Sequence, residues 1–330
     1  MTAPLTQILL DRIAAAGPMT LADYMADALL HPSYGYYSTR DPLGAAGDFT
    51  TAPEISQMFG ELIGLALAQA WIDQGRPTPF TLAELGPGRG TRRADLLRAT
   101  TGVPGFAEAA ELHLVEASPR LRRAQADRLS RAAPGWHDHA DSLPDQPLFL
   151  VANEFFDALP IRQFQREGSG WRERLVGAES GMLKIGLGGP ATHPDLTARI
   201  ADTRPGDIVE ICPAAGPIAA VLARRIAAHG GAGLIIDYGG WRSLGDTLQA
   251  VRDHAPTDLL TQPGQADLTA HVDFEALTRA AKAAAPAVQV SQMIPQGVFL
   301  ERLGITARAR ALAERLTGDA LPGHVAAHRL

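Results

Sequence analysis

The sequence predicts an α/β fold built on a mostly parallel, Rossmann-like sheet. The first observation is the stretch Phe80 to Thr91, in which a short apolar run leads into a turn with glycines at 86, 88 and 90. The second is the continuously apolar run from Pro147 to Ala152, which suits a parallel strand covered on both faces. The third is the alternation of such runs with helix-like segments, which is typical of βαβ units.

The glycine turn indicates a nucleotide-like ligand. Glycines in this spacing let the backbone approach a ligand that a Cβ would exclude. A dinucleotide fingerprint reads G-x-G-x-x-G, but Thr91 stands where its third glycine would be. Instead an acid, Glu84, lies near the end of the strand and precedes G-x-G-x-G. That arrangement is found in class I S-adenosylmethionine (SAM) methyltransferases, and the turn alone leaves a nicotinamide cofactor open.

The composition is that of an ordinary folded protein. The chain has 330 residues, of which 46% are apolar and 20% charged, which allows a large core and argues against disorder. The net charge of -6 gives no electrostatic basis for binding nucleic acid. No apolar stretch approaches the ~18 residues that a membrane span needs. We therefore expect small molecules or proteins as partners.

The cysteine content and the N-terminal residues bear on the compartment. Cys212 is the only cysteine, so the sequence allows no internal disulfide and no multi-thiolate zinc site. The first residues lack the basic region and apolar run of a secretory signal. We expect a reducing, cytoplasmic location.

Residues 1–75 predict a helical region that covers the site. Helix-like spacing occupies residues 4–16 and 20–30, and the aromatic stretch H-P-S-Y-G-Y-Y follows from His31 to Tyr37. Aromatic residues in such a turn usually pack on the core. Tyr36 and Tyr37 could instead face a ligand.

A polar loop then precedes another helix. The segment from Gly47 to Glu61 starts as a loop, and apolar residues recur at helical spacing from Phe59 to Trp71. Asp48 lies on the loop, where it is freer to take part in chemistry than a residue on the helix.

The predicted methyltransferase core comprises residues 76–160 and 206–305. After the glycine turn, Glu111 to Glu116 predicts a strand that ends at an acid, and Ser118-Pro119 begins a helix reaching about Ala132. An acid that ends the second strand of a βαβ unit can accept hydrogen bonds from both ribose hydroxyls. Glu116 is therefore a candidate ribose ligand.

Two further strands place polar groups at the same edge of the sheet. A short strand ends at Asp138, and the apolar run to Ala152 is followed by Asn153 and Glu154. In α/β sheets, ligands bind in the crevice outside the carboxyl ends of the strands. Asn153 and Glu154 therefore open into the predicted crevice.

The rest of the chain contains an insertion and the end of the core. Short alternating runs with glycine-rich turns predict an inserted β-rich meander over residues 161–205. The α/β pattern resumes at 206–240 with a strand, a helix and a buried strand ending at Asp237. A helix to Ala285, a strand over 287–292 and a helical tail over 306–330 complete the prediction.

Taken together, several stretches resemble one family, the MidA-like SAM-dependent methyltransferases. The matching stretches are H-P-S-Y-G-Y-Y, G-D-F-T-T-A-P-E-I-S-Q-M-F-G-E, E-L-G-P-G-R-G-T, N-E-F-F-D-A-L-P, I-D-Y-G and D-L-T-A-H-V-D-F, in order over about residues 20 to 300. Mitochondrial members of this family methylate an arginine of a respiratory complex I subunit during assembly. The resemblance implies a class I methyltransferase fold and a protein substrate, such as a complex I subunit. Family members usually end in a segment similar to M-G-x-L-F-K-V-L, which this chain lacks, so we expect a truncated C-terminus.

The resemblance also implies which residues hold SAM. Gly86, Pro87 and Gly88 are expected near the methionine portion, and Glu84 is expected to orient its amino group, directly or through water. Glu116 and Ala117 are expected at the ribose. The remaining expected cofactor residues are Asp138 and His139, near the adenine, and Asn153.

An arginine acceptor would need carboxylates. The guanidinium is charged at neutral pH, so a receptor pairs with it bidentately and aims one nitrogen at the methyl. The predicted catalytic residues are Asp48, Glu154 and Asp157, of which the last two share one side if their turn is helical. The structural alternatives are that Asp157 caps the following turn and that Asp48 ties down its loop.

Other functions are weighed against this one. A non-catalytic SAM-binding assembly factor would keep the same pocket, and a nicotinamide-dependent oxidoreductase would share the strand and Glu116. His137 and His139 share an H-x-H spacing, but nothing nearby completes a metal site, so no metal is expected.

Overall fold

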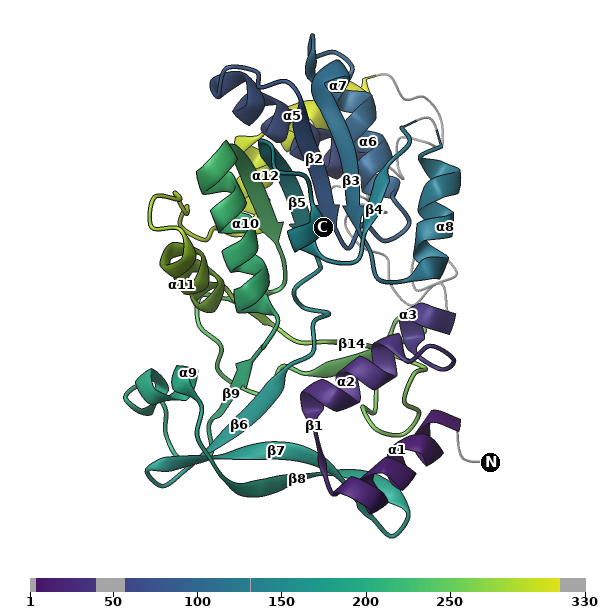
Figure 1. The fold of residues 1–330 in the computed structure, drawn as a ribbon, viewed down its shortest axis with the longest axis vertical. Helices are drawn as coiled ribbons and strands as arrows, with labels where there is room; N and C mark the ends of the chain where they lie inside the picture. Colours follow the sequence, from purple (N-terminus) through teal and green to yellow (C-terminus); the bar gives the residue numbers. More distant parts are fainter. Residues whose placement is uncertain (1–3, 40–56, 131, 315–330) are drawn as a thin grey trace.

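The computed structural model describes residues 4–39, 57–130 and 132–314. Figure 1 shows two lobes stacked along the long axis. We call the one built on the parallel sheet the core lobe. The other, which contains an antiparallel sheet and the first two helices, is the meander lobe.

The core lobe contains a five-stranded parallel sheet in the order β10-β5-β2-β3-β4. Its strands are β2 (Phe80–Leu85), β3 (Ala110–Val115), β4 (Gly135–His137), β5 (Leu148–Asn153) and β10 (Gly231–Ile236). The chain builds outward from β2 to β4 and then returns to the other side of β2 with β5. The strand order therefore reverses between β2 and β5, which is where α/β sheets bind ligands. This confirms the predicted fold class.

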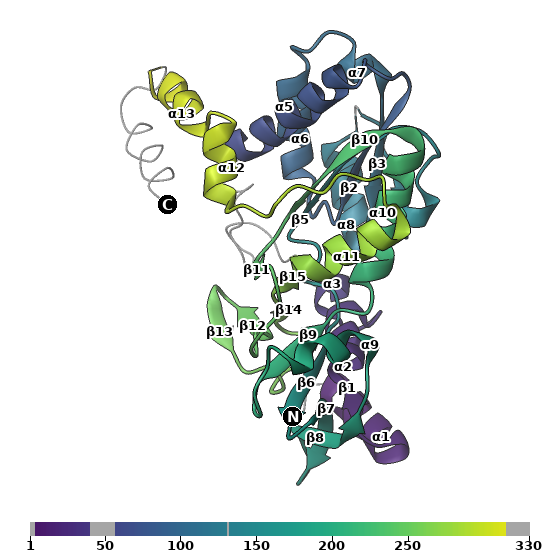
Figure 2. The same ribbon diagram turned by 90° about the vertical axis from the view of Figure 1, so that its left-hand side faces the viewer.

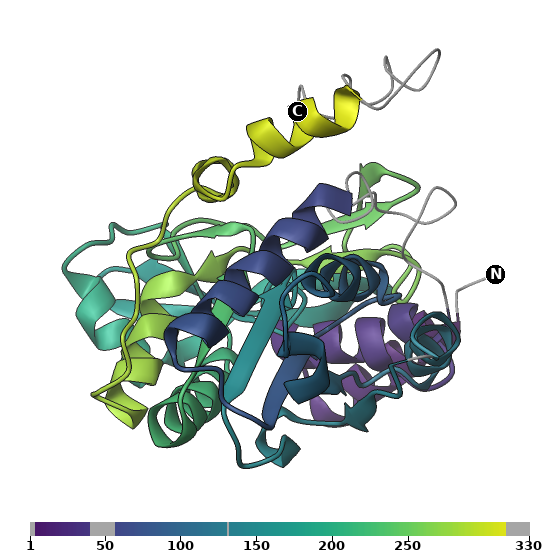
Figure 3. The ribbon, with the colours of Figure 1, turned by 90° about the horizontal axis from the view of Figure 1, so that it is seen from above.

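Helices cover both faces of this sheet. Side chains alternate along β2, so Phe80 and Leu82 pack with α5 (Gln57–Asp73) and α6 (Thr91–Thr100), whereas Ala83 and Leu85 belong to the cluster formed with α10 (Ala215–His229). Figure 3 shows α5 lying across the sheet. Because both faces are covered, β2 and β5 are buried along their whole length.

The meander lobe combines the insertion with the N-terminal helices. Its sheet runs β1-β7-β6-β9, with β8 paired to β7. Helices α1 (Pro4–Ala16) and α2 (Leu21–Leu30) pack in one apolar cluster with Val176 of β7. The strands are β1 (Met19–Thr20), β6 (Arg162–Glu167), β7 (Gly170–Glu179), β8 (Met182–Ala191) and β9 (Ile208–Ile211).

Smaller elements connect the lobes and extend the core. Figure 2 shows α12 and α13 standing apart from the sheet, and β12 to β14 on the side of the molecule. The helices are α3 (Tyr36–Thr39), α7 (Phe106–Ala109), α8 (Pro119–Arg128), α9 (Pro194–Thr197), α11 (Phe274–Ala284), α12 (Gln296–Arg302) and α13 (Ile305–Ala313), with single 3-10 turns at Ala140–Ser142 and Ala198–Ile200. The strands are β11 (Gly239–Gly240), β12 (Gln249–Arg252), β13 (Ala255–Thr257), β14 (Asp267–Thr269) and β15 (Val272–Asp273).

Three parts of the prediction differ from the structure. Residues 208–211 form β9, which pairs with β6, so this strand belongs to the insertion's sheet and not to the core. Residues 287–292 are not a strand. The three-stranded sheet of β12, β13 and β14 was not predicted. The expected truncation concerns the last residues of the chain, and residues 315–330 lie outside the described ones.

Among the described residues, no helix is both long and apolar enough to cross a lipid bilayer.

Candidate cofactor and acceptor site

A cavity of about 230 Å³ lies at the carboxyl ends of β2, β3 and β5. Seven of the predicted site residues line it, namely Gly86, Pro87, Gly88, Glu116, Ala117, Asn153 and Glu154. The sequence-based prediction missed Arg92 and Phe155, which also line it, and left Tyr37 undecided. Leu29 and Leu30 of α2 close the cavity from the meander lobe. The strand order therefore brings the separate motifs to one place.

The glycine turn forms the floor of this cavity. Gly86, Gly88 and Gly90 have φ of 59°, 55° and 77°, values that residues with a side chain rarely adopt. A Cβ added to Gly86 would lie 2.9 Å from Cδ2 of Phe155. The backbone turns sharply here, because the Gly86 N–H donates to the Val115 carbonyl at the end of the neighbouring strand, at 3.0 Å. A larger residue at 86 would therefore disturb both the turn and the cavity wall.

Glu116 is buried at the end of β3 and fixed by two donors. Its Oε1 accepts from the Ser118 backbone N–H at 2.8 Å, and its Oε2 accepts from Nε2 of Gln125 at 3.2 Å. Burial raises the pKa of this carboxyl, and these hydrogen bonds oppose the rise. A carboxylate has about four acceptor positions. Two of them are used, so Glu116 can still accept from a pair of ligand hydroxyls.

Glu84, which is predicted to orient the cofactor's amino group directly or through water, does not line the cavity. Its Oε1 accepts from Nε of Arg92 at 2.7 Å, and its Oε2 lies 2.9 Å from Nε of Arg93. All three side chains are buried. Glu84 therefore anchors two guanidinium groups beneath the glycine turn, and Arg92 is the member that reaches the cavity.

Acidic side chains gather beside the cavity. Glu154 is held at φ 50°, outside the usual range for a non-glycine residue, and its carboxyl contacts Nδ2 of Asn153 at 3.3 Å. Asp237 follows β10, and its Oδ2 accepts from the backbone N–H groups of Phe155, Phe156 and Asp157 at 3.2, 2.9 and 3.3 Å. One carboxylate thus fixes the turn that carries both predicted acceptor residues, Glu154 and Asp157.

The charges in this group raise one another's pKa. Burial and then the nearby Asp237 raise the pKa of Asp157, and burial raises that of Glu154 while Arg92 opposes the rise. Burial also raises the pKa of Asp237. Like charges in a buried cluster cannot all be ionised at little cost. Full ionisation of this group is therefore unfavourable without a cation nearby.

Tyr37 connects this group to the meander lobe. Its hydroxyl donates to Oδ1 of Asp267 at 2.8 Å, and its carbonyl accepts from Oγ of Ser118 at 2.8 Å. Burial and the charge of Asp267 raise the pKa of Tyr37. Of the two tyrosines left open by the sequence, Tyr36 is fully buried in the core and Tyr37 faces the cavity.

Four predicted site residues that the structure describes do not line the cavity, namely Glu84, Asp157, Asp138 and His139. Asp138 is largely exposed and pairs with Nη2 of Arg122 at 2.6 Å, and His139 is not among the lining residues either. Their contact with adenine stays a prediction. Asp48 lies outside the described residues.

Among the described residues, the H-x-H motif of His137 and His139 is not part of a metal site. His137 Nε2 lies 2.9 Å from Nδ1 of His113, in a pair within the sheet. Over residues 4–39, 57–130 and 132–314, no group of three or more His, Cys, Asp or Glu side chains is arranged to hold a metal ion.

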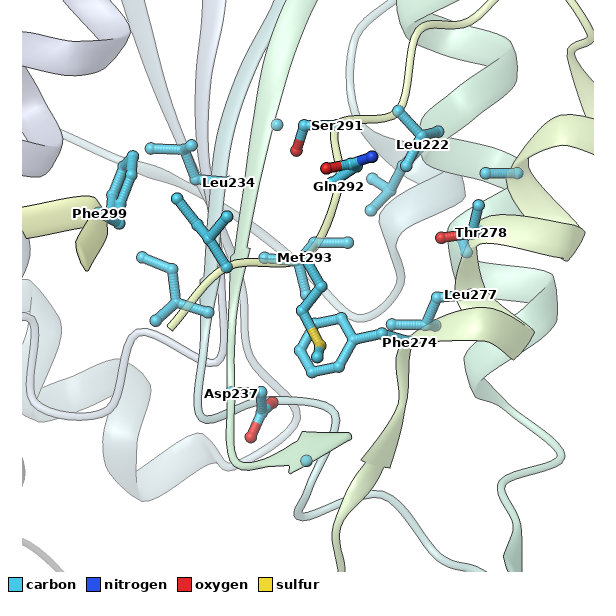
Figure 4. A pocket seen from close by; sticks show the side chains of 18 of the residues that line it. Leu222, Leu234, Asp237, Phe274, Leu277, Thr278, Ser291, Gln292, Met293 and Phe299 are labelled. Atoms are coloured by element: carbon cyan, nitrogen blue, oxygen red, sulfur yellow. The ribbon is translucent and has the colours of Figure 1, made fainter. Parts of the chain in front are cut away.

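A second cavity, of about 540 Å³, runs along the outer edge of β10 (Figure 4). Apolar side chains of α10 and α11, among them Leu222 and Leu277, form one wall, and residues 288–296 pass along the other side. Asp237 lies at one end of it. Residues 287–292 do not pair with β10, which has β5 as its one strand neighbour in the described part of the chain.

The residues of the smaller cavity suit SAM. The left-handed turn at Gly86, the free acceptor positions of Glu116 and the cation Arg92 match a nucleoside with two hydroxyls and a zwitterionic tail. The cofactor would therefore be held by Gly86 to Gly88, Glu116 and Arg92.

Comparisons with known proteins agree with this site. A family model for S-adenosyl-L-methionine-dependent methyltransferases matches residues 62–292. Among curated proteins, the chain is 38% identical to the Homo sapiens protein arginine methyltransferase NDUFAF7, over 94% of this chain and 76% of that protein. It is also 38% identical to the Xenopus laevis protein of that name, over 93% of this chain and 76% of the relative.

A solved structure matches the whole fold. A protein of Burkholderia thailandensis described as a likely methyl transferase, crystallised with S-adenosyl-homocysteine, superposes with a TM-score of 0.82 at 30% identity. The match covers 98% of this chain and 86% of the other.

The cytoplasmic location expected from the sequence is wrong by this comparison, because the curated relatives are named as mitochondrial proteins. A single cysteine and the lack of a secretory signal indicate only a compartment in which thiols stay reduced. They do not distinguish one such compartment from another.

The cavity geometry, the family match over residues 62–292 and the likeness to a structure with bound S-adenosyl-homocysteine lead to one conclusion. The chain belongs to the family of S-adenosyl-L-methionine-dependent methyltransferases.

Proposed function

We propose that this protein methylates an arginine side chain of another protein. The observation that carries the proposal is Glu154, which lines the cofactor cavity and lies in the same turn as Asp157. The curated relatives are named protein arginine methyltransferases, which supports this choice of acceptor.

The acidic group suits a guanidinium acceptor. A guanidinium is always charged at neutral pH and pairs with carboxylates in a planar, bidentate geometry. Glu154 and Asp157 supply the carboxyls, and Asp237 fixes their turn through three backbone hydrogen bonds. Entry of the cation favours the ionised forms, so binding would release protons from these carboxyls.

The bound cofactor supplies a methyl group on a positively charged sulfur. The residues of the chain position the acceptor nitrogen in line with that methyl, which is the main catalytic task in such a transfer. One N–H proton of the guanidinium must leave when the new C–N bond forms, because the methylated product keeps a single positive charge. Glu154 is placed to take this proton, since it lines the cavity and its pKa is raised toward neutrality.

We propose a subunit of respiratory complex I as the substrate. This finer proposal is supported by the resemblance to the MidA-like family, in which mitochondrial members act on such a subunit. Asp48, predicted as a third acceptor residue, also stays a prediction.

The test is comparative mass spectrometry of methylarginine in the native cell. Deleting the gene should remove at least one methylarginine from the proteome, and complementation with the wild-type gene should restore it. Complementation with Glu154→Gln should not restore it, although the variant still binds S-adenosyl-homocysteine. A proteome with unchanged methylarginine sites would overturn the proposed acceptor.

A further inference from the structure

Two buried arginines face a single carboxylate beneath the cofactor cavity. Arg92 and Arg93 both pair with Glu84, at 2.7 and 2.9 Å. Arg93 is fully buried and Arg92 is 6% exposed. Among the described residues, neither arginine has a second ion pair. Taken by itself, this cluster carries one net positive charge, and Glu154 interacts with Arg92 without forming an ion pair.

Burying such a charge is energetically unfavourable unless an anion compensates it. Removing an ion from water costs several kcal/mol even after relaxation, and one partner cannot fully compensate two cations. Burial lowers the pKa of Arg93, in keeping with this cost. Nη1 of Arg92 is buried and has no hydrogen-bond partner among the described residues. The arrangement thus has an unused, oriented donor.

That donor belongs to a side chain that lines the cofactor cavity. Arg92 is the second residue of α6, which begins at Thr91 directly after the glycine turn. A helix N-terminus carries partial positive charge, so it adds to the attraction for an anion there. The acids Glu116 and Glu154 also line the cavity, and they repel an anion. A negative group in this cavity is therefore directed to its cations, Arg89 and Arg92, of which Arg92 is the buried one with an unused donor.

We infer that Arg92 binds the α-carboxylate of the cofactor's methionine portion and selects for ligands that carry this group. Glu84 acts as a positioning residue, since its carboxylate fixes Nε of Arg92 and leaves Nη1 for the ligand. The charges balance on binding, because two cations then face two anions. The inference concerns the cofactor and is independent of the acceptor, so it can fail while arginine methylation holds.

The experiment compares two ligands by isothermal titration calorimetry. S-adenosyl-homocysteine has the carboxylate, and 5′-methylthioadenosine has the same nucleoside and sulfur without the amino acid tail. Arg92→Met should weaken S-adenosyl-homocysteine by about 10- to 100-fold, as expected for a lost hydrogen bond to a charged group. It should change the affinity for 5′-methylthioadenosine less than about threefold. The affinity of Arg92→Lys for S-adenosyl-homocysteine should lie between those of wild type and Arg92→Met, because lysine keeps the charge but lacks the planar guanidinium.

Glu116→Gln is the matched control, since a ribose contact is shared by both ligands and should weaken them equally. If Arg92→Met weakens both ligands equally, its role is structural and the inference fails. If it weakens neither, the inference also fails.

A second measurement uses only the wild-type protein, so it does not require any variant to fold. The wild-type protein should bind S-adenosyl-homocysteine at least about tenfold more tightly than the decarboxylated analogue, which keeps the amino group and lacks only the carboxylate. Equal affinities would overturn the inference even if Arg92→Met is insoluble.

Discussion

At the scale of single residues, Gly86 is the most constrained position of the cofactor site. Its φ of 59° is unfavourable for valine, and a Cβ there would meet Phe155 at 2.9 Å. We expect Gly86→Val to reduce affinity for S-adenosyl-homocysteine by more than about 30-fold, since both the turn and the cavity wall must shift. Calorimetry on the folded variant measures this, and Gly102→Val is the control, because nothing lies within 4 Å of a Cβ there. Equal binding by Gly86→Val and wild type would contradict it.

Asp157 gives a pH-dependent prediction. Burial and the charge of Asp237 raise its pKa in the folded protein above the ordinary value of about 3.9. The folded state therefore binds a proton that the unfolded state releases, and stability is lost as pH rises through the interval between the two pKa values.

Asp157→Asn removes this proton linkage. Relative to wild type, the variant should become more stable as pH rises from 5 to 8, by up to about 1.4 kcal/mol per pH unit for one proton. Urea denaturation at each pH measures the difference. A difference that stays constant with pH would show that Asp157 ionises in the folded protein as it does in the unfolded chain.

At the scale of elements, α8 shows how a helix start also serves the site. Ser118 is the N-cap, and its Oγ accepts from the Leu121 N–H at 3.3 Å while it donates to the Tyr37 carbonyl. Its own N–H holds Glu116. Ser118 thus brings together the start of α8, the Glu116 carboxylate and the segment that contains Tyr37.

Ser118→Ala should cost about 1 to 2 kcal/mol of stability, because it removes a cap and an interlobe hydrogen bond. It should weaken S-adenosyl-homocysteine only severalfold, since the backbone N–H that fixes Glu116 remains. Urea denaturation and calorimetry on one preparation measure both effects. Ser130→Ala, at an exposed position just beyond α8, is the control. A loss of stability no larger than that of this control would count against the cap.

The elements predicted best are those whose signal is local. The continuous apolar character of Phe80 to Leu85 and the cap at Ser118-Pro119 gave the bounds of β2 and the start of α8 to the residue. Glu116 and Asn153 were predicted as site residues because parallel strands bring their carboxyl ends to one edge.

The missed features depend on contacts distant in sequence. The I-V-E-I run at 208–211 suits a core strand, but its partner, β6, could be found only from the fold. Residues 287–292 have a strand-like pattern and no strand beside them. Arg92 reads as an ordinary solvated helix arginine, since its burial comes from the pair with Glu84 eight residues earlier.

At the scale of the whole molecule, the cofactor cavity joins the two lobes. Its walls come from the glycine turn of the core lobe and from Leu29 and Leu30 of α2 in the meander lobe. A ligand bound there contacts both lobes and should stabilise them as a unit. At a concentration of 100 times Kd, the expected gain is about 2.7 kcal/mol.

Hydrogen exchange measured by mass spectrometry tests this coupling. S-adenosyl-homocysteine should slow exchange in α2 as well as in the turn after β2, because ligand binding suppresses opening of both. The Gly86→Val protein, mixed with the same ligand, should show neither change. Protection confined to the core lobe would show that the lobes open independently.

The left-handed backbone of Glu154 has a consequence for how the sequence can change. A φ of 50° costs glycine almost nothing and costs glutamate on the order of 1 kcal/mol or more. A library varied at this position and selected for heat resistance alone should therefore drift toward glycine or asparagine. The same library selected for methyl transfer should keep glutamate. The residue that is best for stability at this position therefore differs from the residue that is best for activity.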